Sequence, residues 1–466
     1  MKKKLYLPIL ALLTLFVSCF EDLDDNLNPA STTSINDFIY RGLNFFYLYK
    51  ADTPQLANDA FADETAKNAF ISSFESPEEI FDFLKSDQDR FSILVDNYVD
   101  LENELSGITL NNGMEYGLVF YPDDSGNIFG YVRYVLPNTD AEAKGIQRGD
   151  VFNTVNGQQL DENNFNRLLD PDSYEIGLAT YDGTNILPTG ETVLLTKTQY
   201  TENPIYLERT YTIEGEKVGY IMYNQFNRDF DPELNAVFGN FNAEGVTKLI
   251  LDLRYNGGGS VETATDLSSM ITGQFNGEIF YNEQWNDDRQ DAYANPGLFN
   301  NTISNGDAIN SLNLTKVYIL TSGRSASASE LVINGLAPYI DVVQVGDNTT
   351  GKFQASFLLY DAPAPTFSRS EANPNHTYAM LPLVFKTANA AGNTDYIDGL
   401  SPDITIRENY SNLGILGDIT EPLLAEALDD IFFTNRPIIH FTPLEEVSDS
   451  NAGSIIDGIM VIDRIE

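Results

Sequence analysis

An apolar stretch that runs into three consecutive glycines is the feature that most constrains the fold of this chain. Lys248-Leu-Ile-Leu-Asp252 predicts a buried strand, Gly257-Gly258-Gly259 follow it, and Val261 to Leu267 predict a helix. Glycines at such a turn let the backbone bend sharply and let a carbonyl group approach bare N–H groups. The pattern predicts a strand-to-helix turn of an α/β layer, and it leaves open whether the turn also binds a ligand.

A second segment offers a nucleophile and a base. The string Thr321-Ser-Gly-Arg-Ser-Ala-Ser-Ala-Ser-Glu330 is followed further along the chain by Gly351-Lys352. A serine hydroxyl needs a neighbouring base to take its proton, and the two histidines of the chain, His376 and His440, lie in no recognisable motif. A lysine can replace histidine if burial lowers its pKa from about 10.4 towards about 7.

The surroundings of these residues favour that chemistry without proving it. Lys352 follows a predicted buried strand, Val342 to Gly346, and Glu330 to Ala337 predict a helix whose N–H groups would lie near a developing oxyanion. Ser-Ala-Ser-Ala-Ser alone is equally typical of a helix entry or a loop. The stretch from Gly346 to Lys352 also fits the glycine and lysine positions of a phosphate-binding loop, but Phe353 stands where that loop needs a hydroxyl.

Together these segments resemble the C-terminal processing peptidases, also called tail-specific proteases, a serine–lysine family. The strings that carry the resemblance are Gly219-Tyr220-Ile221 with Phe226, Leu251 to Arg254, Gly257 to Gly259, Ser325 to Glu330, and Gly351-Lys352. The likeness extends over most of the chain from about residue 100 onward, and segments near Asp398 and Gly417 resemble the closing part of the family.

The resemblance assigns a role to each matching residue. It implies that Ser327 is the nucleophile, that Lys352 is the general base, and that the N–H groups of Gly258 and Ala328 are the oxyanion donors. It implies protein or peptide substrates, no cofactor and no metal, and an α/β core similar to that of ClpP and crotonase. Two positions depart from the family: position 356 is serine where many members have a glutamine, and Pro338 stands where some have an acidic residue. These departures leave the orientation of Lys352 open.

A smaller β-rich module precedes the catalytic strings. Gly130 to Pro137, Ala141 to Val151 and the Asn156-Gly157 pair predict a strand, a short helix, a second strand and a hairpin. This pattern resembles a PDZ domain, and Gly117, Leu118, Val119 and Phe120 resemble its carboxylate-binding loop. Such domains bind an extended peptide as an added strand. The alternative is a small β-rich domain that only packs on the peptidase.

The first residues predict the compartment. Lys2-Lys3-Lys4, an apolar run from Leu5 to Val17, and Ser18-Cys19 are typical of a secretory signal. Cys19 is the only cysteine and resembles the lipidated cysteine of a bacterial lipoprotein, which would anchor the chain to a membrane. The acidic stretch that follows resembles that of outer-membrane lipoproteins of Bacteroidetes. Both the cell surface and the periplasmic side remain open.

Composition and charge complete the prediction. The formal net charge of −42 would repel nucleic acid, no second stretch of about 18 apolar residues exists, and no metal-ligand cluster was found. Aromatic residues at helical spacing predict a helical N-terminal domain with its own core or a cover for the peptidase. Residues 281–310 predict a long loop or lid.

The sequence therefore predicts a multi-domain α/β (α+β) protein whose function is serine-type endopeptidase activity on extracytoplasmic proteins or peptides. The alternative is a non-catalytic, peptide-binding surface lipoprotein, and the oligomeric state is not predicted. The predicted regions are a signal peptide (1–19), an acidic tether (20–33), a helical domain (34–100), a PDZ-like domain (101–200), a catalytic domain (205–445) and a C-terminal tail (446–466).

Overall fold

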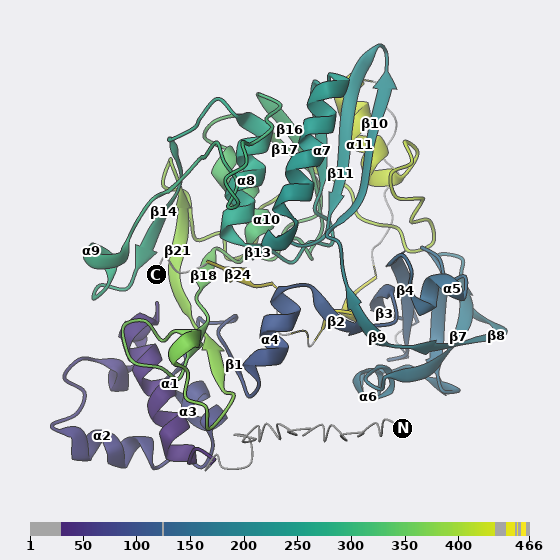
Figure 1. Cartoon of the computed structure of the whole chain (residues 1–466). Helices are drawn as coiled ribbons and strands as arrows, with labels where there is room; N and C mark the ends of the chain where they lie inside the picture. Colours follow the sequence, from purple (N-terminus) through teal and green to yellow (C-terminus); the bar gives the residue numbers. More distant parts are fainter. Residues whose placement is uncertain (1–28, 124, 434–443, 453, 455–457, 463–466) are drawn as a thin grey trace, which may run out of the picture.

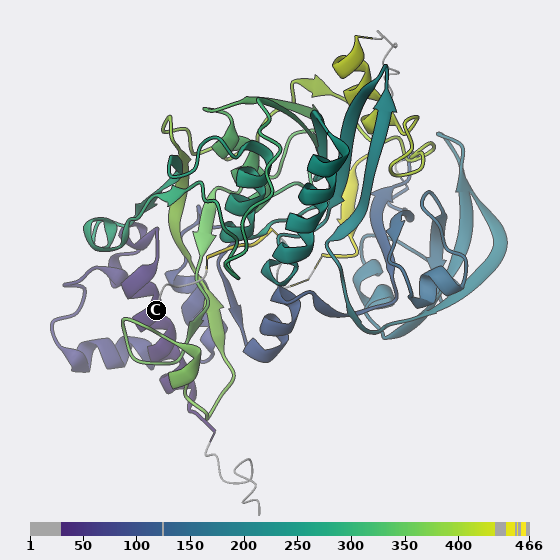
Figure 2. The ribbon, with the colours of Figure 1, turned by 45° about the horizontal axis from the view of Figure 1, so that its top comes forward.

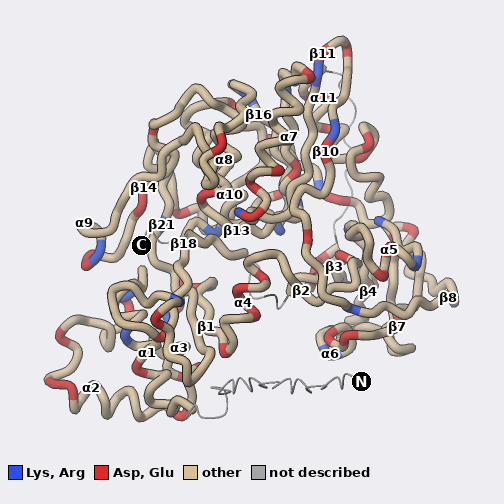
Figure 3. Tube along the Cα trace, viewed as in Figure 1, with Lys and Arg blue, Asp and Glu red and all other residues tan. Residues whose placement is uncertain are grey.

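The structure is a computed structural model that describes residues 29–123, 125–433, 444–452, 454 and 458–462. Its chain forms a helical N-terminal region, a small β-rich unit and an α/β unit (Figure 1). The predicted signal peptide, Cys19, most of the acidic tether and His440 lie outside the described residues. Within the part of the chain that is described, no helix is long and apolar enough to cross a membrane. Acidic side chains are spread over all three units (Figure 3).

The main sheet of the α/β unit has six strands in the order β10-β11-β12-β16-β17-β22. Strands β11 to β22 of this order run parallel, and β10 is antiparallel to β11. Parallel strands are buried on both faces, which explains their almost continuous apolar sequences. The strands are β10 (Ile205–Ile213), β11 (Glu216–Tyr223), β12 (Lys248–Asp252), β16 (Lys316–Thr321), β17 (Asp341–Gly346) and β22 (Ile404–Thr405).

Helices cover both faces of this sheet. Because side chains alternate along a strand, Leu249 and Leu251 pack with the helices of one face, whereas Ile250 packs on the other face with α11. The helices of the first face are α7 (Asp231–Glu244), α8 (Val261–Thr272) and α10 (Ala328–Leu336), and α11 spans Pro422–Phe432. The predicted strand, glycine turn and helix from Lys248 onward are confirmed as β12 and α8, and the predicted helix near Glu330 is α10.

A second sheet of six strands lies beside the first, in the order β13-β24-β18-β21-β14-β15. Its strands are β13 (Gly259–Ser260), β24 (Met460–Val461), β18 (Gln354–Ser356), β21 (Leu383–Asn389), β14 (Ile279–Trp285) and β15 (Gly297–Leu298), and α9 (Gln290–Tyr293) follows β14. The prediction of a loop from Tyr281 onward is wrong for Tyr281 to Trp285. Pairing with β21 and burial of Trp285 against Phe385 override the polar composition of that stretch.

The N-terminal region is helical, as the aromatic spacing predicts. Ser31 caps α1 through its side chain, and Pro77 occupies the first turn of α3, where its missing N–H is not needed. Phe46 of α1 packs on Phe357 and Trp285 of the α/β unit, so the region covers that unit and shares its core. The helices are α1 (Thr32–Phe46), α2 (Glu64–Ile71), α3 (Pro77–Leu84) and α4 (Tyr98–Leu105).

Two small sheets connect the units. Strand β1 (Ile93–Val95) of the N-terminal region pairs with β20 (Ala379–Leu381), which pairs with β19 (Leu359–Tyr360). Strands β2 (Ile108–Asn111) and β9 (Thr198–Thr201) pair where the chain enters and leaves the small β-rich unit. The chain therefore passes into and out of this unit side by side (Figure 1).

The small β-rich unit has its own core, which includes Ile128, Phe152 and Ile176. Its sheet follows the order β23-β3-β4-β5-β7-β8, with β6 paired to β5. The elements are β3 (Met114–Phe120), β4 (Ile128–Val135), α5 (Asp140–Ala143), β5 (Val151–Val155), β6 (Gln158–Gln159), α6 (Phe165–Leu169), β7 (Ser173–Tyr181), β8 (Ile186–Thr196) and β23 (Glu446–Asp449). Residues 446–449 of the predicted tail are thus a strand of this sheet.

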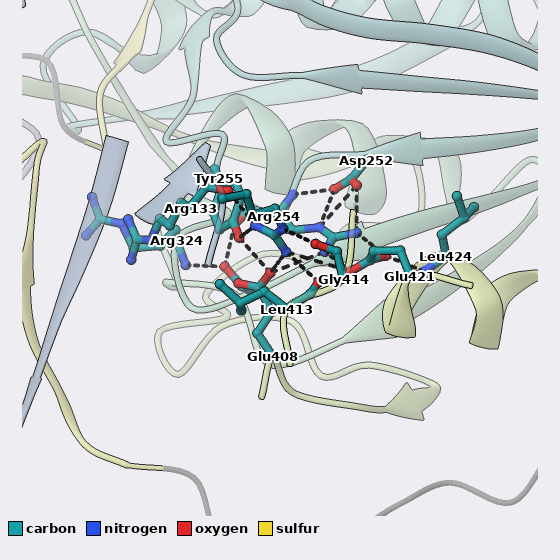
Figure 4. A network of polar contacts seen from close by, with 12 residues as sticks. Arg133, Asp252, Arg254, Tyr255, Arg324, Glu408, Leu413, Gly414, Glu421 and Leu424 are labelled. Atoms are coloured by element: carbon teal, nitrogen blue, oxygen red, sulfur yellow. Dashed lines mark hydrogen bonds and ion pairs between the residues drawn. The ribbon is translucent and has the colours of Figure 1, made fainter. Parts of the chain in front are cut away.

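A buried ion network joins the small unit to the α/β unit (Figure 4). Arg254 is fully buried and bonds Asp252 at 2.8 Å and Glu421 at 2.6 Å. Arg148, from the small unit, bonds Glu408 at 2.6 Å and the Tyr255 hydroxyl at 2.8 Å. Because only Asn256 separates Arg254 and Tyr255 from the three glycines, the network fixes the start of that turn.

Replacing Arg254 tests how far the fold depends on this network. We expect Arg254→Met to lower the free energy of unfolding by about 3 to 5 kcal/mol, because it leaves buried carboxylates without their partner. The matched control is Arg407→Met, since Arg407 pairs with Asp347 at a half-exposed site and should contribute about 1 kcal/mol or less. Urea unfolding measures both. Equal losses for the two variants would contradict the central role of Arg254.

The network also predicts acid sensitivity. Burial opposes ionisation of Glu408, but Arg148 and Arg254 outweigh it and lower its pKa from 4.5 to about 2. The stabilisation is therefore complete above about pH 4.5 and is lost as the pH falls towards about 2. We expect the wild-type protein to lose about 3 kcal/mol more than Glu408→Gln between these limits, measured by urea unfolding. Parallel pH profiles of the two proteins would refute this.

Candidate active site

The glycine turn after β12 is held by Asn256. The Asn256 side chain donates to Tyr223 O at 2.8 Å and accepts from the Gly258 N–H at 2.9 Å. Gly258 and Gly259 have φ values of +118° and +129°, a region that favours glycine. A Cβ on Gly259 would lie 2.2 Å from Phe226 O, so only glycine fits this approach. The Gly258 N–H, a predicted oxyanion donor, is engaged with Asn256 in this state, and its role stays a prediction.

Ser327 is the residue that directly precedes helix α10. Its φ of +64° is uncommon for a residue with a side chain, and such strain persists only where the surrounding structure imposes it. Ser327 is fully buried. Ala328 begins the helix, so its N–H is among the donors that the helix itself leaves without a partner, at the positive end of the helix dipole.

The serine and the glycine turn lie against each other. A Cβ added to Gly258 would lie 2.8 Å from Ser327 Oγ and 2.6 Å from Ser327 Cβ. Ser329 Oγ donates to Asn256 O at 2.9 Å, and Ser325 Oγ donates to Leu253 O at 2.8 Å. The outer two serines of the motif therefore bind the two segments together, as expected of structural residues.

Lys352 enters from the segment that follows β17. Its side chain is fully buried. The Lys352 Nζ lies 4.9 Å from the centre of the Phe91 ring, within the range of a cation–π contact. Phe91 belongs to the segment that links α3 to β1, so the N-terminal region covers the lysine. No sequence pattern indicates the contact between Phe91 and Lys352.

A single carboxylate connects the serine to the lysine. The Ser327 and Lys352 N–H groups donate to Glu330 Oε2 at 2.7 and 2.8 Å, and the Gly351 N–H and Thr349 hydroxyl donate to Oε1 at 2.7 and 2.5 Å. Burial raises the Glu330 pKa, although these four donors oppose the rise. Glu330 is part of the serine motif, but its position three residues after Ser327 predicts only a helix cap, so its link to the lysine was missed.

Two residues that follow Lys352 closely in the chain, Gln354 and Ser356, contact other groups. The Gln354 side chain donates to the Tyr49 hydroxyl at 2.8 Å. Ser356, at the position where many relatives have glutamine, is buried in β18, and its carbonyl accepts from the Ile462 N–H at 3.2 Å.

The predicted peptide-binding residues require a correction. Gly117, Leu118, Val119 and Phe120 lie inside strand β3 rather than in a loop, because they pair with β4 on one side and β23 on the other. The edge of β3 is occupied by β23 in this structure, so a peptide could add there only after β23 leaves, and their binding role stays a prediction. The position of this edge beside the α/β unit is visible in Figure 2.

Other candidate sites are less developed. His376 bonds Asp361 at 3.0 Å and accepts from the Tyr378 N–H, as a packed structural residue does. Among the residues that the structure describes, no group of three or more His, Cys, Asp or Glu side chains could hold a metal ion.

A cleft of about 550 Å³ opens beside the glycine turn. It lies between the small unit and the α/β unit, and its walls include Gly257 to Ser260, Arg324 and Tyr134. Burial, together with repulsion from Glu115, raises the pKa of Glu202 in this cleft to about 8. The arrangement provides a serine, a lysine, a helix N-terminus and an extended cleft, which are the elements that acyl transfer to serine requires.

Comparisons with known proteins agree with this chemistry. The model of peptidase family S41 matches residues 217–361, and that of the Peptidase S41 N-terminal domain matches residues 34–93. A crystal structure named as an S41 protease from Bacteroides fragilis is 25% identical, with a TM-score of 0.68, covering 86% of this chain and 98% of that chain. Residues 217–361 therefore resemble peptidase family S41, and the predicted multi-domain α+β fold is confirmed.

Curated relatives point to the same class. A carboxyl-terminal-processing protease of Picosynechococcus sp. is 24% identical over 306 residues, or 63% of this chain and 64% of that protein. A protease of the same name from Synechocystis sp. is 25% identical over 258 residues, or 53% and 56%. The chain spans less than two thirds of the length of these curated relatives. Both curated relatives are named as proteases, in agreement with the match to the model of peptidase family S41.

Changing one oxygen of Glu330 tests its connecting role. In Glu330→Gln an amide NH₂ replaces one acceptor and faces backbone donors, so we expect the free energy of unfolding to fall by about 1 to 3 kcal/mol. We also expect labelling of Ser327 by a fluorophosphonate probe to slow roughly tenfold or more, because the serine shifts relative to the lysine.

The control for this substitution is Glu233→Gln. Glu233 also lies in the first turn of a helix, α7, but it is exposed. Labelling and urea unfolding of this variant should match the wild-type protein. Unchanged labelling in Glu330→Gln would show that the carboxylate only stabilises the fold.

Proposed function

We propose that this protein is a serine-type endopeptidase that uses Ser327 and Lys352 as a dyad. The observation that carries the proposal is the bridge through Glu330, which holds the backbones of both residues on one carboxylate beside the glycine turn. The match of residues 217–361 to the model of peptidase family S41 supports the proposal. No cofactor takes part in this chemistry.

The dyad would work by acyl transfer. Ser327 Oγ attacks the scissile carbonyl carbon while Lys352, in its neutral form, takes the hydroxyl proton. The tetrahedral oxyanion is stabilised by the Ala328 N–H and, after it leaves Asn256, by the Gly258 N–H. Lys352 returns the proton to the leaving amine as the C–N bond breaks. Water then attacks the acyl-serine while Lys352 takes a proton from it, and Lys352 passes that proton to Ser327 Oγ as the ester C–O bond breaks.

The substrate would be an extended stretch of an extracytoplasmic protein or peptide, near a C-terminus or in an unfolded segment. We propose that the small β-rich unit is a PDZ-like module that binds such a chain along β3, in the place that β23 occupies in this structure, through backbone hydrogen bonds that depend little on the peptide sequence. The names of the curated relatives, carboxyl-terminal-processing proteases, support this choice.

The site of action is proposed from the sequence. The lysines and apolar run that precede Cys19 support secretion and attachment through a lipid on that cysteine. The protein would then act at the outer membrane, facing the cell surface or the periplasm, with its net charge keeping it away from nucleic acid.

Hydrolysis assays test the dyad. We expect Ser327→Ala and Lys352→Met each to lower the rate of casein or peptide hydrolysis by at least about a thousandfold, because either change removes proton transfer from the attack. Two exposed residues supply the controls, Ser370→Ala and Lys316→Met, which should hydrolyse casein like the wild-type protein.

Two other outcomes would be decisive. Equal hydrolysis by the wild-type protein and both dyad variants would remove the roles assigned to Ser327 and Lys352. Absence of hydrolysis in every form, together with no fluorophosphonate labelling of Ser327 after long incubation, would favour the alternative, a peptide-binding lipoprotein without catalysis.

A further inference from the structure

Residues 459–462, here called the cleft segment, lie as an extended strand beside the catalytic serine. Strand β24, within this segment, pairs in parallel with β13 of the glycine turn and with β18, the strand that follows Lys352. The Gly259 N–H donates to Ile459 O at 2.7 Å, and the Ile462 N–H donates to Ser356 O at 3.2 Å. In Figure 1 this segment lies between β13 and β18.

The cleft segment closes the approach to the nucleophile. A Cβ added to Gly258 would lie 2.7 Å from Ile459 O and 2.8 Å from Ser327 Oγ, so both oxygens flank the same side of this glycine. Ile459 and Val461 form part of the cleft wall. Ser327 and Met460 are fully buried. A peptide substrate cannot reach a fully buried hydroxyl, so this part of the structure has to move before any attack.

A strand that precedes the cleft segment in the chain, β23, occupies the edge of the small β-rich unit. Strand β23 pairs antiparallel with β3, with Asp449 opposite Gly117 and Ser448 opposite Leu118. Asp449 is buried between Arg133, at 2.8 Å, and Arg324, at 2.7 Å. Strand addition at this edge is the recognition mode proposed for a peptide, and here the chain supplies the added strand itself.

Ile459 lies beside Ser327 as an inhibitor would, because its carbonyl is not bound by the donors proposed for an oxyanion. Its carbonyl accepts from the Gly259 N–H, whereas the donors proposed for an oxyanion are those of Gly258 and Ala328. The pairing of β24 with β13 involves two residues on each strand. A peptide of extended shape could supply the same few backbone hydrogen bonds and so replace the segment.

We propose that two parts of the chain together inhibit the site: β23 (Glu446–Asp449), which covers the edge of β3, and the cleft segment (residues 459–462), which lies beside Ser327. An incoming extended peptide that places an apolar side chain in the site of Met460 displaces the cleft segment and gains access to the serine. This inference rests on the proposed function and adds to it the resting state of the site and the kind of peptide it accepts.

A charged side chain in the buried site of Met460 tests the proposal in the full chain. Met460→Asp places a carboxylate among apolar groups, which favours departure of the cleft segment into water. We expect casein hydrolysis to rise roughly tenfold above that of the wild-type protein. The matched control, Ala452→Asp, adds the same charge at an exposed position of the same stretch and should leave the rate unchanged.

A second variant covers the case in which Met460→Asp fails to fold, which its thermal melting curve would reveal. Ile462→Pro removes the N–H that donates to Ser356 O and keeps an apolar side chain. It should also raise hydrolysis. If folded forms of either variant hydrolyse casein no faster than the wild-type protein, the inhibitory role is overturned.

A binding measurement separates this inference from the proposed function, because it needs no catalysis. The probe is a fluorescein-labelled peptide of residues 458–462, Gly-Ile-Met-Val-Ile, and the readout is fluorescence anisotropy. In the Ser327→Ala background, Met460→Asp should bind the probe at least about tenfold more tightly than the protein with the native segment, because the segment no longer competes.

The combined outcomes distinguish the two claims. Tighter binding by Met460→Asp with no hydrolysis in any form would support the self-occupied cleft and refute the peptidase. Hydrolysis that depends on Ser327, with equal binding and equal rates for both forms of the segment, would support the peptidase and refute self-inhibition.

Discussion

The interaction on which the site depends is the buried carboxylate of Glu330. Its oxygens accept the N–H groups of Ser327 and Lys352, together with two further donors from the segment that leads to the lysine. Burying a carboxylate is costly, and it is tolerated here because hydrogen bonds to four donors offset the lost hydration. The same contacts hold the positive φ of Ser327 in place. The carboxylate therefore fixes the backbone of Ser327, the proposed nucleophile, and that of Lys352, the proposed base.

A second buried polar network positions the glycine turn relative to the small β-rich unit, on either side of the cleft. Arg254 and Tyr255 lie just before the glycine turn, and through Glu408 they contact Arg148 of the small β-rich unit. The turn that faces the serine and the unit proposed to bind peptides therefore share one set of charges. A rearrangement of the small unit on peptide binding would act on the glycine turn through this network, which includes no residue of the proposed dyad.

Ser327 and Lys352, the proposed nucleophile and base, are both fully buried, which is consistent with a resting state of the site. The N-terminal region places Phe91 over Lys352, β23 lies along the edge of β3, and the cleft segment pairs with β13 of the glycine turn. A closed site keeps water from the lysine and restricts access to chains that can compete for the same backbone hydrogen bonds. Exposure of the serine would then be controlled by the peptide itself.

The sequence by itself determined the local units of this protein. Apolar runs with glycine turns predicted β12, α8 and α10, and the resemblance of the ordered motifs to the C-terminal processing peptidases implied the class of protein. Those signals are short-range, because strand, turn and helix preferences are set by neighbouring residues. Only the tertiary structure decided which donors Glu330 accepts, that Phe91 covers Lys352, that Gly117 to Phe120 form a strand, and that the cleft segment lies beside Ser327. These contacts join segments far apart in the chain, and no periodicity in a sequence specifies which distant partner a side chain or an edge strand will meet.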